Sequence, residues 1–108
     1  MLTSQLTFSS GNWFGVILGD NALAEIVGER TGNAPTSAGD ILRFQAPHSR
    51  YVFTVSHKEW VRPDRARDPA DTLTPDLLVP VTREDIRGGG QQFWDVHLRR
   101  VLDALAGR

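Results

Sequence analysis

Two adjacent serines, Ser9 and Ser10, stand just before an apolar run that begins at Trp13. Hydroxyl residues followed by apolar residues at helical spacing indicate the N-terminus of an amphipathic helix. A helix N-terminus has backbone N–H groups without partners and carries the positive end of the helix dipole, so it can stabilise a negatively charged oxygen. Ser9 is therefore either a nucleophile for acyl transfer or an ordinary N-cap that accepts a hydrogen bond from the first helical turn.

Hydrolysis by a serine also needs a proton acceptor and a donor for the developing oxyanion. The backbone N–H of Ser10 is the natural oxyanion donor, because it lies at the start of the helix. Histidine has the most suitable unperturbed pKa for a general base. His57 is the preferred histidine, since it follows a predicted strand and precedes an irregular loop. The other candidates for the base are His48, His97, Glu29 and Glu59.

The serine segment and several later segments resemble the tail-specific, or carboxy-terminal-processing, serine peptidases. This family also includes the tricorn core protease and the repeats of interphotoreceptor retinoid-binding protein. The similarity covers two longer runs and four short landmarks in the same order: 2–10, 24–33, 35–40, 53–56, 62–64 and 74–76. Each motif is weak alone, but together they span nearly the whole chain. The resemblance implies a serine-type endopeptidase that cleaves extended polypeptide without a cofactor, with Ser9 as its nucleophile.

The resemblance also implies residues that bind substrate. It places Gly32 and Asn33 in a flap beside the serine, within a loop at 29–40 whose composition fits a plain surface connection equally well. Arg62 would hold a peptide carboxylate with its planar fork of donors. The alternative is that the alternating charges from 62 to 71 form a solvated face.

One position departs from the family pattern. Many members carry a lysine base in the flap, whereas the aligned position here holds Ala34. Alanine cannot accept a proton, so a Ser-Lys dyad is absent. Two further hypotheses therefore stay open. The chain is a non-catalytic module that binds a peptide or a small apolar ligand, as the retinoid-binding relatives suggest, or it is an inactive fragment.

The elements expected around the serine form a β-α-β unit. Strands at 1–3 and 24–28 flank a helix at about 9–19, which predicts parallel strands joined by a right-handed crossover. Phe14, Ile17 and Leu18 are expected on the buried side of the helix.

Two β-rich runs, 41–46 and 50–56, predict an antiparallel hairpin with one half-buried face. Either its edge accepts an extended peptide by strand addition, or the strand is internal and has no free edge. Trp60 is expected to be a buried anchor under the following loop rather than a pocket wall.

The last third predicts a turn at 74–76, a strand at 77–81 and a capped helical turn at 82–85 that ends at the glycines 88–90. A terminal helix from Gln91 should pack on the sheet through its apolar residues, Trp94, Leu98, Val101 or Leu102, and Leu105. The fold class is α/β, and 1–108 is a single domain. The resemblance makes it a crotonase/ClpP-like βαβ core fragment with a β-hairpin and a C-terminal helix, corresponding to the later half of the peptidase core.

Composition limits the partners. The chain has 108 residues, with 12 basic and 13 acidic residues interspersed, so nucleic acid is not an expected partner. There is no cysteine, and the three histidines are scattered, so no metal site is expected. The partners that the resemblance implies are a polypeptide substrate and the upstream half of the catalytic core. A strand remnant at Met1 would leave an unpaired edge, which favours self-association. The Met1 end lacks the pattern of a signal peptide, although the family is often extracytoplasmic.

Overall fold

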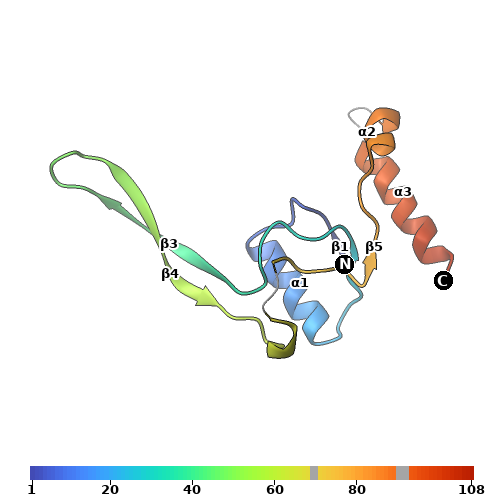
Figure 1. Cartoon of the computed structure of the whole chain (residues 1–108), viewed down its shortest axis with the longest axis horizontal. Helices are drawn as coiled ribbons and strands as arrows, with labels where there is room; N and C mark the ends of the chain where they lie inside the picture. The colour runs from blue at the N-terminus through green and yellow to red at the C-terminus, as the bar shows by residue number, and fades with distance from the viewer. Residues whose placement is uncertain (69–70, 90–92) are drawn as a thin grey trace.

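A protruding hairpin gives this mixed α/β chain an elongated shape. The computed structural model describes residues 1–68, 71–89 and 93–108, and its principal extents are 60 × 37 × 18 Å. The hairpin, β3 and β4, extends to one side of a small body built on α1, while α2 and α3 lie on the other side (Figure 1).

The body contains the expected β-α-β unit. Strand β1 (Leu2–Thr3) leads to helix α1 (Ser10–Asp20), and strand β2 (Val27–Gly28) returns beside β1 in parallel register. A third parallel strand, β5 (Leu77–Leu78), pairs with the other side of β2, so the order is β1-β2-β5. The prediction of two parallel strands around the serine helix is confirmed.

Strand β2 approaches β1 so closely that one position must be glycine. Gly28 has φ 119°, and a Cβ there would lie 2.3 Å from the carbonyl oxygen of Thr3. Alanine at this position would be both strained and in collision with backbone.

We therefore expect Gly28→Ala to lower the free energy of unfolding by about 2 kcal/mol. Urea titration followed by circular dichroism measures it. Gly88→Ala is the matched control, because a Cβ at Gly88 meets nothing within 4 Å. An unchanged urea midpoint for Gly28→Ala would contradict this account of the β1–β2 contact.

One face of helix α1 packs on the chain segment before β5. Val16 forms a buried cluster with Ile26 and Leu73, and a Cβ at Gly15 would lie 2.8 Å from the Leu73 side chain. The buried residues of the helix are Asn12, Gly15 and Val16. The expectation that Phe14 faces the core is wrong, because this close approach at Gly15 turns Phe14 outward to 58% exposure.

Helix α3 (Phe93–Ala106) packs on the small sheet through Val101, and helix α2 (Arg83–Gly89) packs against α3. Thr82 and Asp85 form a reciprocal cap, since Asp85 Oδ2 accepts from Thr82 N at 2.7 Å and Thr82 Oγ1 accepts from Asp85 N at 3.2 Å. The predicted cap is confirmed. Helix α2 continues beyond the expected single turn to Gly89, and Gly90 and Gln91 lie outside the described residues.

The buried stripe of α3 agrees with the prediction at Val101 and Leu105 and differs from it elsewhere. Val101 clusters with Val27 and Val79, with Ala104 and Leu105 packed against them. Trp94, Leu98 and Leu102 are 41–55% exposed. Buried His97 belongs to the packed face as well, because it bonds the Val79 carbonyl oxygen at 2.6 Å. Among the described residues, no helix is long and apolar enough to cross a membrane.

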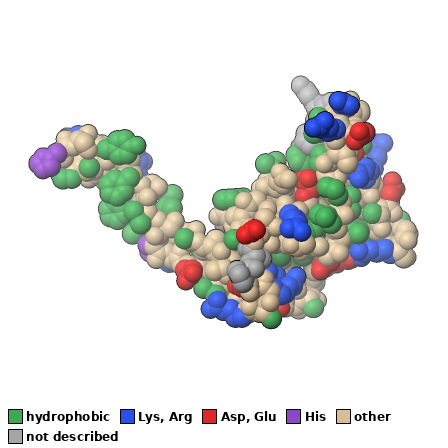
Figure 2. Space-filling model, in the orientation of Figure 1, with side chains coloured by type: hydrophobic (Ala, Val, Ile, Leu, Met, Phe, Trp, Pro, Cys, Tyr) green, Lys and Arg blue, Asp and Glu red, His purple; other side chains and the backbone are tan. Residues whose placement is uncertain are grey.

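Strands β3 (Ser37–Gln45) and β4 (Val52–Trp60) form the predicted hairpin, which is longer than expected. Facing pairs put four apolar residues on one face, Leu42 with Val55 and Phe44 with Phe53. The two phenylalanine rings stack with centroids 5.6 Å apart. Every residue of β4 is exposed, so the prediction of a half-buried strand is wrong for this chain. Figure 2 shows hydrophobic side chains along this hairpin, which we call the arm (37–60).

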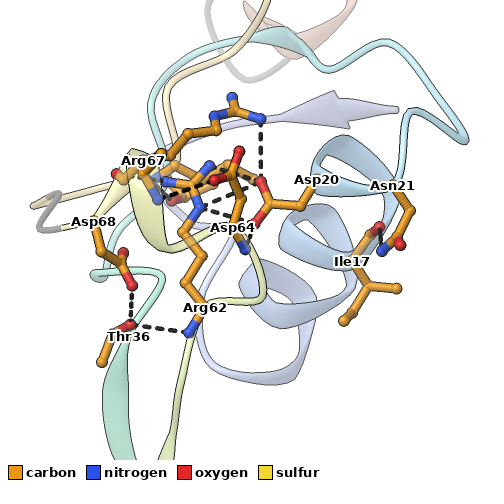
Figure 3. Close-up of polar contacts among 11 residues, drawn as sticks. Ile17, Asp20, Asn21, Thr36, Arg62, Asp64, Arg67 and Asp68 are labelled. Carbon is orange, nitrogen blue, oxygen red and sulfur yellow. Dashed lines mark hydrogen bonds and ion pairs between the residues drawn. The ribbon is translucent and has the colours of Figure 1, made fainter.

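A buried ion pair joins the end of α1 to the segment after the hairpin (Figure 3). The Asp20 carboxylate accepts from Arg62 at 2.8–3.2 Å, from Arg67 Nη1 at 3.1 Å and from the Asp64 N–H at 3.1 Å. The side chains of Asp20 and Arg62 are only 1% and 3% exposed. The expectation of a solvated charged face is therefore wrong for Arg62, although the short helix Arg65–Arg67 remains mostly exposed.

Candidate functional site

Ser9 lies at a sharp turn between β1 and α1. Its backbone has φ 53° and ψ −120°. These angles belong to the first central residue of a type II′ turn, a position that usually holds glycine. A side chain in such a region costs of order 1–3 kcal/mol, and this kind of strain is concentrated at functional sites.

The Ser9 hydroxyl does not cap the helix. Ser9 occupies the N-cap position, but its side chain makes no cap hydrogen bond. The ordinary capping role predicted as the alternative is therefore absent. The Ser10 N–H has no acceptor among the described residues, so a backbone donor is free beside the hydroxyl.

Glycine at position 9 should make the protein more stable. Removing Cβ from this φ releases the strain, which we expect to exceed the 0.5–1 kcal/mol entropic cost of glycine. Ser9→Gly should therefore be about 1 kcal/mol more stable than Ser9→Ala, which keeps the strained Cβ. Thermal unfolding of the two variants measures the difference. A less stable glycine variant would show that the turn is not strained.

Asn33 and Asn12 hold the serine turn against the flap. Asn33 Oδ1 accepts from the Ser9 N–H at 2.9 Å. In return, Asn12 Nδ2 donates to the carbonyl oxygens of Asn33 and Ala34 at 3.0 and 3.1 Å. Asn33 was predicted to contact substrate, and this stays a prediction: its side chain holds the Ser9 backbone, and Asn33 also lines the cavity beside Ser9. Sequence reasoning missed Asn12, whose signal is an amide within an otherwise apolar run.

Gly32 is a packing position. Its N–H donates to the Thr7 carbonyl oxygen at 2.9 Å, and a Cβ there would lie 2.4 Å from the carbonyl oxygen of Gln5. The flap therefore packs at Gly32 directly on the loop that precedes Ser9. Gly32 is not among the residues that line the cavity beside Ser9, which is described next. Its predicted contact with substrate gains no support from this position.

A cavity of about 220 Å³ opens beside Ser9. Ser10 and Asn12 also contribute to it, and Phe8, Trp13, Pro35 and Trp60 supply apolar wall. The rings of Trp13 and Trp60 lie 5.5 Å apart at 57°. Trp60 is 41% exposed, so the prediction of a buried anchor is wrong and the rejected alternative, a pocket wall, is observed.

The first four residues of β3, Ser37 to Asp40, also line this cavity, and the last of them is charged. Asp40 is the acidic residue among the described lining residues, and its carboxylate forms an ion pair with Lys58. Hydrogen bonding from Lys58 and the Lys58 charge hold the pKa of Asp40 below its ordinary value. Asp40 was not singled out from the sequence, because its neighbour Lys58 lies 18 positions away on the other strand.

The candidate bases are dispersed. Glu29 is buried and accepts backbone bonds from Val81 at 3.0 Å and Gln5 at 3.5 Å, so it supports the fold. His97 is buried against Val79. His48 lies in the turn of the hairpin, and Glu59 is exposed on β4.

His57 lies at the base of the hairpin. Its Nδ1 bonds the carbonyl oxygen of Asp40, which leaves Nε2 as the nitrogen able to accept a proton. Asp40 lines the cavity, but His57 is not one of the described lining residues. Its role as the base remains a prediction.

Arg62 binds a carboxylate, as its guanidinium predicts. That carboxylate belongs to Asp20 of the same chain and not to a substrate. Its guanidinium is occupied by Asp20 and by the carbonyl oxygen of Arg67 at 3.2 Å. Burial would raise the pKa of the Asp20 carboxyl, but the bonds from Arg62 and Asp64 and the charges of Arg62 and Arg67 outweigh it and lower the pKa. The predicted grip on a peptide carboxylate is not supported, because no donor of Arg62 faces the cavity lining.

A strained serine at a strand-to-helix turn, with a free backbone donor and a cavity beside it, is a combination also found around the nucleophile of serine hydrolases. Comparison with solved structures agrees with this class. The chain has a protease-like fold similar to that of CPAF, the chlamydial protease-like activity factor, a serine protease. Mature CPAF superimposes with a TM-score of 0.67 and 26% identity over 89% of this chain.

A serine-to-alanine mutant of CPAF gives a TM-score of 0.64, again at 26% identity over 89% of this chain. The chain spans only 17–18% of the length of these neighbours. No protein-family model and no curated protein matches the sequence.

Proposed function

We propose that this chain carries the nucleophile of a serine endopeptidase of the tail-specific type, on a crotonase/ClpP-like core. The observation that carries the proposal is the strained conformation of Ser9, whose hydroxyl is not used for capping. Strain that the fold maintains without a structural benefit is expected where a side chain must be presented for chemistry. The likeness to a serine protease supports the same class.

Groups near the serine turn can carry out separate steps of peptide hydrolysis. Ser9 Oγ attacks the scissile carbonyl carbon, and the Ser10 N–H, with the positive end of α1, stabilises the oxyanion that forms. His57 Nε2 is the candidate to take the serine proton. The upstream half of the core, in the same protein or in trans, would add a second oxyanion donor and raise the rate that Ser9 and the Ser10 N–H support on their own.

The substrate is an extended polypeptide. Strands β3 and β4 pair only with each other among the described residues, so their outer edges are free. A peptide added to the edge of β3 would be led toward Ser9, because residues Ser37 to Asp40 of β3 line the same cavity.

One observation favours a second candidate function. The described lining of the cavity contains no histidine, lysine or glutamate. A cavity with aromatic walls, whose acidic residue Asp40 is already paired with Lys58, also suits a non-catalytic module that holds a peptide or a small apolar ligand.

Labelling with a fluorophosphonate tests the proposal, because these reagents form an adduct with an activated serine. We expect one adduct per chain, mapped by mass spectrometry to Ser9, absent from Ser9→Ala and kept in Ser10→Ala, which retains its backbone N–H. His57→Ala should label more slowly. No adduct, or an adduct on another serine, would reject the nucleophile and favour the binding module.

Self-association belongs to the same proposal. Strand β1 is at the edge of its sheet, and the arm exposes the apolar face of Leu42, Phe44, Phe53 and Val55. Edges and apolar patches of this kind promote association. Sedimentation velocity should show concentration-dependent oligomers, which Phe44→Ser should weaken. A monodisperse monomer would contradict this part.

A further inference from the structure

A residue that lines the cavity, Asp40, is already paired with a cation of the protein, Lys58. Lys58 and Trp60 are two residues apart on β4, so their side chains leave the same face of the strand. The Lys58 ammonium pairs with the Asp40 carboxylate, and both Asp40 and Trp60 line the cavity. The partially exposed pair, with side chains 57% and 47% exposed, can open without unfolding anything.

The rest of the cavity suits a chain with an apolar stem. Trp13 and Trp60 form one wall, and Phe8 and Pro35 add to it. Trp60 lies flat against β3 because Gly39 has no side chain, and a Cβ there would lie 2.9 Å from Trp60 Nε1. Indole faces attract a nearby cation, and lysine buries its methylene stem on apolar surface while its charge stays at the rim.

We propose that this cavity is a specificity pocket for a lysine side chain of the bound polypeptide, with Asp40 as the residue that recognises its charge. The inference rests on the proposed function for the identity of the ligand as a polypeptide. In the free protein Lys58 pairs with the Asp40 carboxylate, and the lysine of the substrate displaces Lys58 when it binds. A volume of about 220 Å³ accommodates one long side chain, since it equals roughly that of seven liquid water molecules.

Calorimetric titration with two pentapeptides tests the proposal. Both are capped at each end and consist of four alanines around a central lysine or a central norleucine, so a single long side chain is available and only its charge differs. The protein is the Ser9→Ala variant, so binding is measured without cleavage. We expect the lysine peptide to bind about tenfold more tightly than the norleucine peptide.

Two variants identify the residues responsible. Asp40→Asn should bring the ratio of affinities close to one, and asparagine tolerates the φ of 53° found at Asp40. Lys58→Met keeps the stem but frees the carboxylate, so it should strengthen binding of the lysine peptide about threefold and leave the norleucine peptide unchanged. Asp103→Asn removes an equal charge from an exposed position of α3 and should keep the tenfold ratio.

Equal affinities for the two peptides, no binding of either, or a ratio that survives Asp40→Asn would each overturn the proposal. The outcomes distinguish a failure of this inference from a failure of the proposed function. If Ser9 takes no fluorophosphonate but the ratio is found and lost with Asp40, the pocket is real in a binding module. If Ser9 is labelled but the ratio is one, the peptidase proposal stands and the lysine pocket is rejected.

Discussion

Asp20→Asn should lower the free energy of unfolding by about 3–5 kcal/mol at neutral pH, the usual cost of removing one partner of a buried ion pair. The substitution preserves size, so the effect comes from charge. The side chains of Asp20 and Arg62 are 1% and 3% exposed, so the variant leaves a buried guanidinium without its counter-ion. The loss would detach the segment after β4 from the end of α1, and with it the base of the hairpin.

Urea unfolding measured by tryptophan fluorescence checks this expectation. Asp103→Asn is the control, because its carboxylate is exposed on α3. The double variant Asp20→Asn/Arg62→Met should regain part of the loss, since replacing both partners removes the unpaired charge. If Asp20→Asn melts like the control, the ion pair does not hold these segments together.

The same ion pair predicts how stability depends on pH. The folded state lowers the pKa of Asp20 below its ordinary value of 3.8. A carboxyl whose pKa is depressed on folding contributes stability that is complete above the unfolded pKa and is lost as pH falls through the folded pKa. The parent should therefore lose stability below about pH 4, and the loss should be shallower in Asp20→Asn. Parallel pH profiles of the two proteins would contradict the assignment.

Local patterns in the sequence predicted the elements near the serine. The polar step at Ser9, the apolar run after it and the next apolar strand are adjacent in the chain, and adjacent strand and helix signals define a β-α-β unit without further information. The hairpin also follows from neighbouring runs around the turn at 47–49.

The side chains that depend on distant contacts were not predictable in this way. Phe14 was assigned to the core by its spacing, but the helix orientation is set by Leu73, far along the chain. Arg62 was expected to bind substrate. Its actual partner is Asp20, which lies 42 positions earlier and has no local signal in the sequence. Trp60 became a cavity wall because Gly39, on the facing strand, lets it lie flat.

The sequence was enough to select the candidate nucleophile, but not the residues that position it or the base. Hydroxyl residues before a helix identify Ser9, whereas its φ of 53° is a property of the folded turn. Asn33 was predicted by resemblance, but only the structure shows that its amide holds the Ser9 N–H. The base has no local signal, and the described residues around the cavity do not supply a histidine.

Ser9→Ala should abolish peptidase activity, with a loss of at least about 10⁴-fold, because a serine peptidase without its nucleophile retains only the effects of binding and oxyanion stabilisation. Ser10→Ala should stay within a few fold of the parent, since Ser10 contributes its backbone N–H and not its hydroxyl. The contrast between two adjacent serines separates chemistry from the general effect of changing the turn.

The direct measurement is the rate of cleavage of an unstructured peptide that ends in apolar residues, with the parent, Ser9→Ala and Ser10→Ala compared at equal concentration after each is shown to be folded. We predict cleavage by the parent and by Ser10→Ala and none by Ser9→Ala. Equal cleavage by the parent and Ser9→Ala, or none by any of the three, would contradict the claim that Ser9 of this chain is a peptidase nucleophile.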